Sequence, residues 1–406
     1  MPTYVIAGAG AAGISAAEAL RGEGFDGSIV VVGQEGNAPY ARPPLSKTFL
    51  RGEVEIGGVA LRGSDFYAKN AIELRLNERI SALDIANRRI ECSTDREILY
   101  DKLLIATGAI PRKLNAPGES LDGVHYLRTL DDARALRDAF ARRARVLVIG
   151  TGFIGCEAAA SARTVGCEVA LVGQSAPMER ALGKELAAFY ERYHRDRGVE
   201  LKTGATVVEF RGARALESAR LSDGSIIECD AAVIGVGVAP AVEWVPSVIA
   251  SGGVIETDEF CRTNVPDVFA AGDLASSWRP RFNRRIRIEH FYNAESQGAA
   301  AGRAMHGVMQ PYDPIPYFWS DQYDLSLKYY GNAKTWDRIV LRSGNDPNSL
   351  SAFYLKEDRI EAGCAINRPR ETGGIKRLIG QVGISPTELA NSSVSLQSLI
   401  RSEPSH

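Results

Sequence analysis

The chain has 406 residues, 45% of them hydrophobic, and a formal net charge of −2. This length predicts two to three domains with large apolar cores. A net charge so close to zero excludes a protein that gathers nucleic acid or anionic lipid through its overall field, and the sequence contains no run of 18 or more apolar residues that would span a membrane.

The N-terminal segment resembles a secretory signal only superficially. The apolar stretch at 4–20 is interrupted by Glu18, and no basic segment precedes it. The first strand is expected to start near Thr3, which leaves no room for a transit peptide. The six cysteines form no C-x-x-C pair and no set with zinc-ligand spacing. We therefore expect a cytoplasmic protein with small, buried, reduced cysteines and no metal site.

A glycine-rich turn follows the first predicted strand. The apolar residues 4–6 precede residues 8–13, which read Gly-Ala-Gly-Ala-Ala-Gly. The first glycine of such a fingerprint makes the turn, the second lets the backbone approach a pyrophosphate, and the third lets the helix pack on the strand. The helix N-terminus then offers free N–H groups to the phosphates. The segment predicts a dinucleotide-binding unit.

The second predicted strand, at 29–32, leads to a carboxylate with a possible role in this unit. Glu35 lies 22 residues after Gly13, about where an acid accepts the hydroxyls of an adenosine ribose. The alternative interpretation is an exposed loop acid.

A small β insert is expected next. Residues 80–84 and 89–92 predict a hairpin around Ala86-Asn87 rather than a crossover helix. Residues 103–106 predict a further strand of the first unit.

A second dinucleotide unit begins after a change of domain around residues 110–112. Residues 129–132, Thr-Leu-Asp-Asp, predict a helix start with an N-cap hydroxyl and acids in the first turn. A second fingerprint, Gly-Thr-Gly-Phe-Ile-Gly at 150–155, follows the apolar run 146–149. Two fingerprints imply two dinucleotides held by one protein, and the usual reason is electron transfer between a flavin and a nicotinamide.

The rest of the second unit contains one informative absence. The strand predicted at 168–172 ends in Gly173-Gln174-Ser175, without the acid that would mark a ribose 2′-hydroxyl. Residues 222–225 predict a hairpin turn. The apolar run 231–236 leads to a return point at 237–240.

The C-terminal part of the chain differs from the two dinucleotide units in its pattern of predicted elements. Residues 264–273 predict a short strand that ends in a Gly-Asp turn, and a helix is expected at about 289–306. From about residue 312 the pattern predicts an antiparallel meander with a helix or two. Its clearest strands and turns are expected at 326–330, 339–341, 344–347 and 357–358.

A nine-residue motif gives the most specific resemblance. Residues 39–47 read Pro-Tyr-Ala-Arg-Pro-Pro-Leu-Ser-Lys. With the two fingerprints, this motif makes the whole chain resemble the FAD-dependent, NAD(P)H-dependent ferredoxin reductases of bacterial oxygenase systems. These putidaredoxin-reductase-like enzymes are relatives of apoptosis-inducing factor within the glutathione reductase superfamily. Supporting motifs lie at 106–108, 271–273, 293–297 and 318–322.

The resemblance implies an α/β fold with two Rossmann-like dinucleotide-binding domains and a C-terminal α+β domain. The FAD-binding domain would comprise residues 1–110 and 238–311, and the NAD(P)H-binding domain would comprise residues 111–237. Residues 312–406 would form the third domain, on the ferredoxin side.

The resemblance, with the first fingerprint, also assigns residues to FAD. Asp273 would bind the ribityl chain or bridge to the pyrophosphate through water, or it is an ordinary turn aspartate. Glu289 and Asn293 would begin the helix that points at the flavin pyrimidine. Trp319 would lie beside the flavin near the ferredoxin surface, or it is a core tryptophan. The expected FAD contacts are Gly8, Ala9, Gly10, Ala12, Gly13, Glu35, Arg42, Pro43, Lys47, Ala106, Thr107, Gly108, Gly272, Asp273, Glu289, Asn293 and Trp319.

Two charged residues are expected to tune the flavin. Pro43-Pro44 rigidifies the loop before Lys47, whose ammonium would stabilise the negative charge of reduced flavin. The resemblance implies that Glu157 pairs with Lys47 across the domain interface; the alternative is a glutamate favoured by the helix dipole. The expected NAD(P)H contacts are Gly150, Gly152, Phe153, Ile154, Gly155, Glu157, Gln174, Gly235, Val236 and Gly237. NADH is expected from the family, and the missing acid leaves NADPH open, with Arg180 nearby.

The distribution of cysteines bears on where the electrons go. No cysteine lies between Met1 and Cys92, so thiol chemistry at the flavin is not expected. The electrons would leave to a separate 2Fe–2S ferredoxin. A basic cluster within nine residues would dock this acidic partner, or it is a solvated charge run. Its members are Arg279, Arg281, Arg284, Arg285 and Arg287.

The sequence therefore predicts an NAD(P)H:ferredoxin oxidoreductase, a monomer or weak dimer, in which the nicotinamide passes a hydride to the flavin. The ferredoxin would supply a cytochrome P-450 or a Rieske oxygenase. Two alternatives stay open: a redox-signalling flavoprotein like apoptosis-inducing factor, and a reductase of a small acceptor such as monodehydroascorbate or a quinone.

Overall fold

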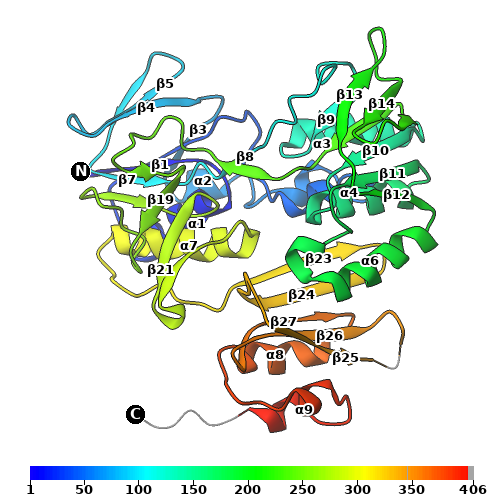
Figure 1. Cartoon of the computed structure of the whole chain (residues 1–406). Helices are drawn as coiled ribbons and strands as arrows, with labels where there is room; N and C mark the ends of the chain where they lie inside the picture. The colour runs from blue at the N-terminus through cyan, green and yellow to red at the C-terminus, as the bar shows by residue number, and fades with distance from the viewer. Residues whose placement is uncertain (345, 401–406) are drawn as a thin grey trace.

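The computed structural model describes residues 1–344 and 346–400. Position 345, within the turn expected at 344–347, and positions 401–406, at the end of the expected third domain, lie outside the described residues. Three larger sheets organise the chain, with the first at the left of Figure 1, the second at the right and the third below them.

The first sheet is parallel and is buried on both faces. Its strand order is β20-β7-β1-β2-β3. Alternate residues of β1 point to opposite faces of the sheet. Tyr4 and Ile6 lie in the core on one face, whereas Val5 and Ala7 lie in the core on the other. A strand covered on both sides needs apolar residues at every position, which explains its continuous apolar run. The bounds are β1 Thr3–Ala7, β2 Ser28–Val32, β3 Ile72–Arg75, β7 Lys102–Ile105 and β20 Val268–Ala270.

Two helices from opposite ends of the sequence cover one face of this sheet. They are α1 (Ala11–Gly22) and α7 (Phe291–Met305). Gly298 lies so close to α1 that a Cβ there would be 2.1 Å from the carbonyl oxygen of Ala12, and only glycine permits this contact between backbones. The helix expected at 289–306 begins two residues later than predicted, because His290 is its extended N-cap and Glu289 precedes it.

Small β elements cover the opposite face and the rim. The predicted hairpin is confirmed, with β4 Ile80–Asp84 and β5 Arg89–Cys92, joined by β6 Glu97–Leu99. A four-stranded sheet follows the second unit. Its strands are β18 Ala250–Ser251, β19 Val254–Thr257, β21 Ala275–Arg279 and β22 Arg284–Arg287. The short helical segments are η1 Pro43–Ser46, η2 Ile56–Val59, α2 Phe66–Lys69 and η3 Pro280–Phe282.

The second sheet repeats the architecture of the first. Its order is β12-β11-β10-β16-β9, again all parallel. The bounds are β9 Val124–Tyr126, β10 Arg145–Ile149, β11 Glu168–Gly173, β12 Val199–Thr203 and β16 Ala231–Ile234. Its helices are α3 Leu130–Ala141, α4 Phe153–Thr164, α5 Glu179–Leu182 and α6 Lys184–Asp196. The predicted start of α3 is confirmed, because Thr129 and Asp132 form a reciprocal capping box.

The two connections between these sheets run side by side. They are β8 (Ala109–Pro111) and β17 (Val238–Pro240), which pair in antiparallel fashion. Between them, the second unit carries a small sheet in which the turn predicted at 222–225 joins the last two strands. Its strands are β13 Val207–Arg211, β14 Ser218–Leu221 and β15 Ile226–Glu228.

The third sheet is antiparallel, but it is not the expected meander. Its order is β23-β24-β27-β26-β25, so β24 pairs with β23 and β27 and not with β25, the next strand in sequence. The reason is burial: β27 is almost entirely buried and takes the centre, whereas β25 alternates between exposed and buried positions and forms an edge. The bounds are β23 Tyr317–Gln322, β24 Leu325–Gly331, β25 Arg338–Ser343, β26 Leu350–Lys356 and β27 Arg359–Ile366.

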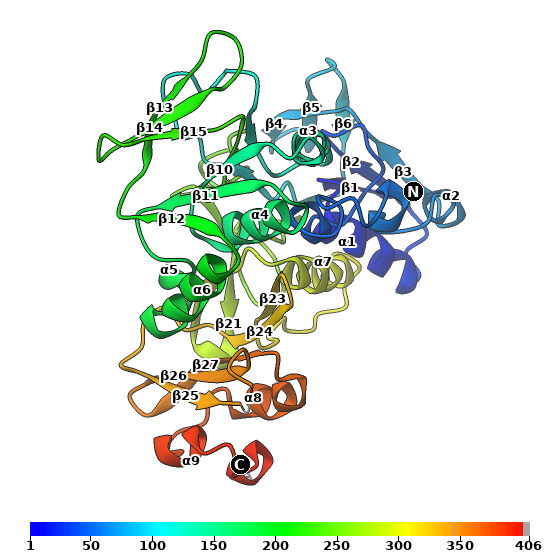
Figure 2. The ribbon, with the colours of Figure 1, turned by 90° about the vertical axis from the view of Figure 1, so that its right-hand side faces the viewer.

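This third sheet packs one face on the second unit and the other on the C-terminal helices. Leu327, Tyr329 and Tyr354 share a core with residues of α4 and α6, and Figure 2 shows α6 between the second and third sheets. The opposite face is covered by short helices. These are η4 Pro369–Glu371, α8 Thr372–Leu378, α9 Pro386–Ala390 and η5 Leu396–Leu399.

A buried histidine joins α6 to the third sheet. His194 is fully buried, with Nε2 2.9 Å from Gln322 Oε1 and Nδ1 3.2 Å from the Tyr323 hydroxyl. Burial lowers the pKa of His194 from 6.5 to about 4. The unfolded chain therefore binds a proton below pH 6.5 that the folded chain does not bind until pH is close to 4.

The free energy of unfolding is expected to fall as pH falls from 6.5 toward 4, with His194 contributing a total loss of about 3 kcal/mol. Denaturant unfolding at pH 7, 6 and 5 would measure the slope. His194→Gln places a hydrogen-bonding amide near Gln322 but has no titrating group, so its slope should be shallower than that of the wild type. Equal pH slopes of the unfolding free energy for the wild type and His194→Gln would contradict this role of His194.

Candidate functional site

The two glycine fingerprints have the same geometry. Gly8 has φ +122°, and a Cβ on it would lie 2.2 Å from the Ala106 carbonyl oxygen. Gly150 has φ +111°, and a Cβ there would lie 2.2 Å from the Gly235 carbonyl oxygen. The third glycine of each motif is equally crowded by the first. Side chains are therefore excluded at both turns for the same steric reason.

The middle glycine of each fingerprint faces open space instead. Gly10 is the N-cap of α1 and Gly152 is the N-cap of α4, and a Cβ on either would meet no atom within 4 Å. At each helix start the N-cap residue therefore brings no side chain of its own in front of the free N–H groups. This is the cradle that a pyrophosphate requires, and both units provide it.

Two arginines lie beside the first cradle. Arg42 Nη2 is 2.6 Å from Glu35 Oε1, and Arg42 Nη1 donates to the carbonyl oxygen of Arg128 at 2.6 Å. Arg128 Nη2 pairs with Asp273 Oδ2 at 3.0 Å, but its Nε is buried without a hydrogen-bond partner. Burial, followed by the charge of Arg42, lowers the pKa of Arg128. An anionic group beside these guanidiniums would accept a hydrogen bond from the unpartnered Nε and would favour the charged form of Arg128. The residues present therefore fit the pyrophosphate of FAD.

A buried carboxylate joins the three main parts of the chain. Glu157 Oε2 on α4 accepts hydrogen bonds from Lys47 Nζ at 2.6 Å and from Ser46 Oγ at 2.5 Å, both at the end of η1. Glu157 Oε1 accepts a bond from Ser320 Oγ of β23 at 2.7 Å. The predicted pairing of Lys47 with Glu157 is therefore confirmed.

The local sequence around Lys47 explains its position. Pro43 and Pro44 open the single turn η1, and the Lys47 backbone N–H closes it on the Pro44 carbonyl oxygen. Lys47 Nζ donates both to Glu157 and to the Pro43 carbonyl oxygen, 3.2 Å away. An ammonium has three donors, so one N–H stays available to a bound group.

The start of α7 presents a second unpaired group. Nδ1 of His290 is buried without a hydrogen-bond partner, and burial lowers the pKa of His290 to about 4. Its ring lies 4.4 Å from that of Phe318, which in turn lies 4.9 Å from Phe153 at the start of α4. These contacts bring β23, α7 and the second fingerprint together.

Several sequence-predicted residues lie at the carboxyl ends of the parallel strands. Residues 106–108 follow β7 beside Gly8, and residues 235–237 follow β16 beside Gly150. Asp273 follows β20 and contacts Arg128. Ligands of open α/β sheets bind at this edge, because the loops after the strands converge there.

Other predicted residues are placed differently. Asn293 accepts a hydrogen bond from Arg279, and donates to Gln297 Oε1 and to a backbone carbonyl, so its side chain belongs to a buried network. Trp319 lies on the opposite face of β23 from Ser320, against Phe291. Neither residue contacts the Lys47–Glu157 pair.

One member of the arginine cluster that was expected to be exposed is buried. Three other members are paired with neighbouring groups. Arg279 is only 1% exposed and bonds to Asn293 and to the Tyr312 carbonyl, because it occupies an inward position of β21. Arg284, Arg285 and Arg287 each bond to a backbone carbonyl and lie beside an acid. Arg281 and Arg285 are exposed, whereas acids beside Arg284, Arg285 and Arg287 partly balance the charge of this run.

Four site residues were not predicted from the sequence: Ser46, Arg128, His290 and Ser320. Ser46 and Ser320 lie inside motifs that the sequence analysis used, but the chemistry of a serine gives no signal until its partner is known. Arg128 directly precedes the N-cap Thr129, at the point where the chain enters the second unit. This place at the domain boundary can be read from the sequence, and it could have marked Arg128 as a candidate site residue.

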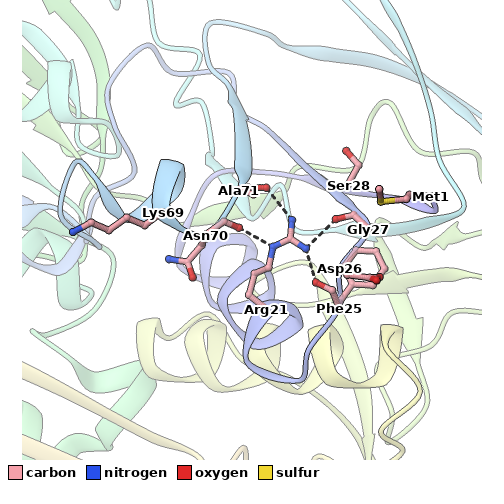
Figure 3. A pocket seen from close by; sticks show the side chains of 9 residues that line it. All are labelled: Met1, Arg21, Phe25, Asp26, Gly27, Ser28, Lys69, Asn70 and Ala71. Atoms are coloured by element: carbon pink, nitrogen blue, oxygen red, sulfur yellow. Dashed lines mark hydrogen bonds between the residues drawn. The ribbon is translucent and has the colours of Figure 1, made fainter.

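A hollow of about 580 Å³ at the other end of α1 is a different kind of feature. Figure 3 shows Arg21 at its centre, where the guanidinium donates to the carbonyl oxygens of Phe25, Gly27, Asn70 and Ala71. All of these contacts tie loops of the first unit together. The hollow lies far along α1 from the fingerprint and adds nothing to the candidate site.

The described residues contain no group of three or more His, Cys, Asp or Glu side chains that could hold a metal. None of the helices in the described part of the chain combines the length and the apolar composition needed to cross a bilayer.

Comparisons with known proteins agree with this geometry. The sequence matches the family Pyridine nucleotide-disulphide oxidoreductase over residues 2–298 and the family Reductase C-terminal over residues 317–400. It is 36% identical to the ferredoxin reductase subunit of 5,5′-dehydrodivanillate O-demethylase from Sphingobium sp. (strain NBRC 103272 / SYK-6), over 91% of this chain and 92% of that protein. It is 35% identical to the ferredoxin–NAD(+) reductase component of an anthranilate 1,2-dioxygenase system from Burkholderia cepacia, over 98% of this chain and 99% of that protein.

The fold also matches a solved structure. The reductase chain in the covalent putidaredoxin reductase–putidaredoxin complex superposes with a TM-score of 0.93 at 32% identity, covering 98% of each chain.

Proposed function

The chain belongs to the pyridine nucleotide-disulphide oxidoreductase family, and from this membership we propose that it is an FAD-dependent NAD(P)H:ferredoxin oxidoreductase. It takes electrons from NADH and passes them singly to a 2Fe–2S ferredoxin, which supplies a cytochrome P-450 or Rieske oxygenase. Bound FAD supplies the chemistry that converts a hydride into single electrons. The observation that carries this function is the joining of two like dinucleotide units by the buried Lys47–Glu157 pair.

The first unit is proposed to hold FAD. The backbone at Gly10 and the N-terminus of α1 face the pyrophosphate, and Arg42 and Arg128 neutralise its charge. Glu35 keeps carboxylate lone pairs for the ribose hydroxyls in addition to its contact with Arg42. The remaining contacts proposed for this half are those of the sequence analysis, with Arg128 and His290 added.

The second unit is proposed to bind the nicotinamide substrate. Gly152 and the N-terminus of α4 receive its pyrophosphate, while on the same helix Glu157 contacts η1 and Phe153 packs on Phe318 of β23. Lys47 then stands where the two units meet. Its free N–H is available to the flavin ring, and Ser46 and Ser320 fix the carboxylate that orients it.

The chain's cysteines do not form a sulfur relay. All six are free and buried. Cys156 is next to Glu157, but burial and that carboxylate raise the pKa of its thiol far above the usual range. Thiolate is the reactive form, so this sulfur is inert. The electrons therefore leave to a separate carrier.

We further propose the domain division expected above, with residues 1–110 and 238–311 around FAD, 111–237 around the nicotinamide and 312–406 beside the ferredoxin. We also propose a cytoplasmic location. For docking, Arg281, Arg284, Arg285 and Arg287 stay a prediction, and Arg279 is withdrawn because it is buried.

Reconstitution with FAD tests the function. The purified protein should take up FAD and turn yellow, lose the yellow band with NADH, and reduce a 2Fe–2S ferredoxin rapidly. A protein that stays colourless would refute the proposal. Turnover with quinones or monodehydroascorbate but not with ferredoxins would favour the small-acceptor reductase. Very slow oxidation of NADH, with a long-lived nicotinamide complex, would favour the signalling flavoprotein.

A further inference from the structure

The backbone register places the two dinucleotide units in residue-by-residue correspondence. Gly8 N–H donates to the Val32 carbonyl oxygen at 2.8 Å, and Gly150 N–H donates to the Val172 carbonyl oxygen at 2.8 Å. The strands that precede these glycines pair in the same register, since Ala7 lies opposite Val32 and Ile149 lies opposite Val172. Residues 33–35 of the first unit therefore correspond to residues 173–175 of the second.

Neither unit can place an acid directly at the strand end. A Cβ on Gly33 would lie 2.8 Å from the Cβ of Ala9, and a Cβ on Gly173 would lie 2.6 Å from the side chain of Thr151. Any side chain at position 173 would have to displace Thr151. The first unit solves this problem by placing its carboxylate two residues later, at Glu35.

The corresponding position in the second unit is Ser175, so the carboxylate is replaced by a neutral hydroxyl. A carboxylate at this place accepts a ribose 2′-hydroxyl and repels a 2′-phosphate. The neighbouring Gln174 is exposed and neutral. Nothing in residues 173–175 would therefore repel a phosphate.

A cation lies at the same edge. Arg180, on the short helix α5, is exposed and donates from Nη2 to Gln174 Oε1 at 2.9 Å. No ion pair of Arg180 occurs within residues 1–344 and 346–400. The nearby Glu179 directs Oε2 to the backbone N–H of Ala176, 3.0 Å away. Four N–H donors of the Arg180 guanidinium stay available for a phosphate.

The loop that carries this group is fixed against the fingerprint. Met178 has φ +64°, and its N–H donates to the Thr151 carbonyl oxygen at 2.8 Å. A non-glycine residue adopts that backbone only where the surroundings impose it. The Gln174–Arg180 contact thus belongs to an ordered loop beside the second cradle.

We propose that the carboxyl end of β11 binds the 2′-phosphate of NADPH through Arg180, so that the enzyme uses NADPH as well as NADH. This inference rests on the proposed function, because it assigns a second substrate to the same site. Ser175, Gln174 and Arg180 are the residues that set the preference between the two nicotinamides.

Steady-state turnover of the FAD-loaded enzyme with each nicotinamide, with ferricyanide as the electron acceptor, tests the proposal. The kcat/KM for NADPH should lie within 100-fold of that for NADH. Arg180→Ala should lower the NADPH value at least ten-fold and change the NADH value less than two-fold. Arg214→Ala, which removes an exposed arginine of the same unit, should change neither. A wild-type preference above 100-fold for NADH, or an equal loss of both activities in Arg180→Ala, would overturn the proposal.

Two further measurements separate phosphate recognition from general damage. Ser175→Glu restores the carboxylate at the position equivalent to Glu35 and should lower NADPH use at least ten-fold while sparing NADH. Adenosine 2′,5′-bisphosphate should bind the wild type at least ten-fold more tightly than 5′-AMP, and this difference should disappear in Arg180→Ala. Equal affinities in the wild type would refute a phosphate site. Ferredoxin reduction with NADH is measured in parallel, because its failure would refute the proposed function instead.

Discussion

Replacing Glu157 with Leu is expected to lower the free energy of unfolding by about 3–5 kcal/mol, because it leaves a buried charge without its partner. Lys47 would keep only the Pro43 carbonyl oxygen, at 3.2 Å. Ser46 and Ser320 would lose their shared acceptor at the same time. The substitution thus removes three side-chain contacts that join α4 to η1 and to β23.

The two residues of the Lys47–Glu157 pair should differ in how strongly their replacement destabilises the protein. Lys47→Met leaves Glu157 with two hydroxyl donors, whereas Glu157→Leu leaves Lys47 with one carbonyl. We therefore expect Lys47→Met to be less destabilising than Glu157→Leu. The double variant Lys47→Met/Glu157→Leu should be more stable than Glu157→Leu alone, because it removes the orphaned ammonium. Denaturant unfolding of the four proteins gives the cycle, and a Glu157→Leu protein within 1 kcal/mol of the wild type would contradict the expectation.

Lys47→Met is expected to lower the two-electron midpoint potential of bound FAD. The reduced flavin is the more negative form, and Lys47 has one N–H left to stabilise it. Loss of a charge-assisted hydrogen bond worth about 1.5–3 kcal/mol corresponds to about 30–65 mV for a two-electron couple. Glu157→Gln should shift the potential upward, since it removes a nearby negative charge and keeps the side-chain shape.

Spectroscopic redox titration measures both shifts. Lys69→Met is the matched control, because Lys69 is an exposed lysine of α2 that pairs with Asp65. Its potential should equal that of the wild type. Shifts of the same sign in Lys47→Met and Glu157→Gln would show that Lys47 and Glu157 do not act on the flavin through their charges.

Local features of this fold could be predicted from the residues themselves, whereas long-range ones either came from the family resemblance or were missed. The hairpin at 80–84 and 89–92 and the N-cap at Thr129 depend on residues close in sequence, and both are confirmed. The pairing of β24 with β27 depends on which strand is most buried, and the expected meander is wrong for that reason. Position in a charge run likewise did not reveal that Arg279 points inward.

The same distinction applies to the site. Glycine fingerprints are visible in sequence because each glycine is required by its own turn. The Lys47–Glu157 pair was inferred through family resemblance, and its geometry is confirmed. Ser46 and Ser320 escaped prediction because a hydroxyl acquires its role only from the acceptor that the fold brings to it.

The positions of the strands along the sequence also set the order in which the two dinucleotide units can fold during synthesis. The first sheet and its cover are completed only by β20 and α7, which end at Ala270 and Met305, whereas every strand of the second sheet lies between Val124 and Ile234. Domains usually fold on the ribosome as they emerge, from the N-terminus onward. Here that order is reversed: the second unit can close while the first unit, although its translation begins earlier, still lacks its last strand and helix.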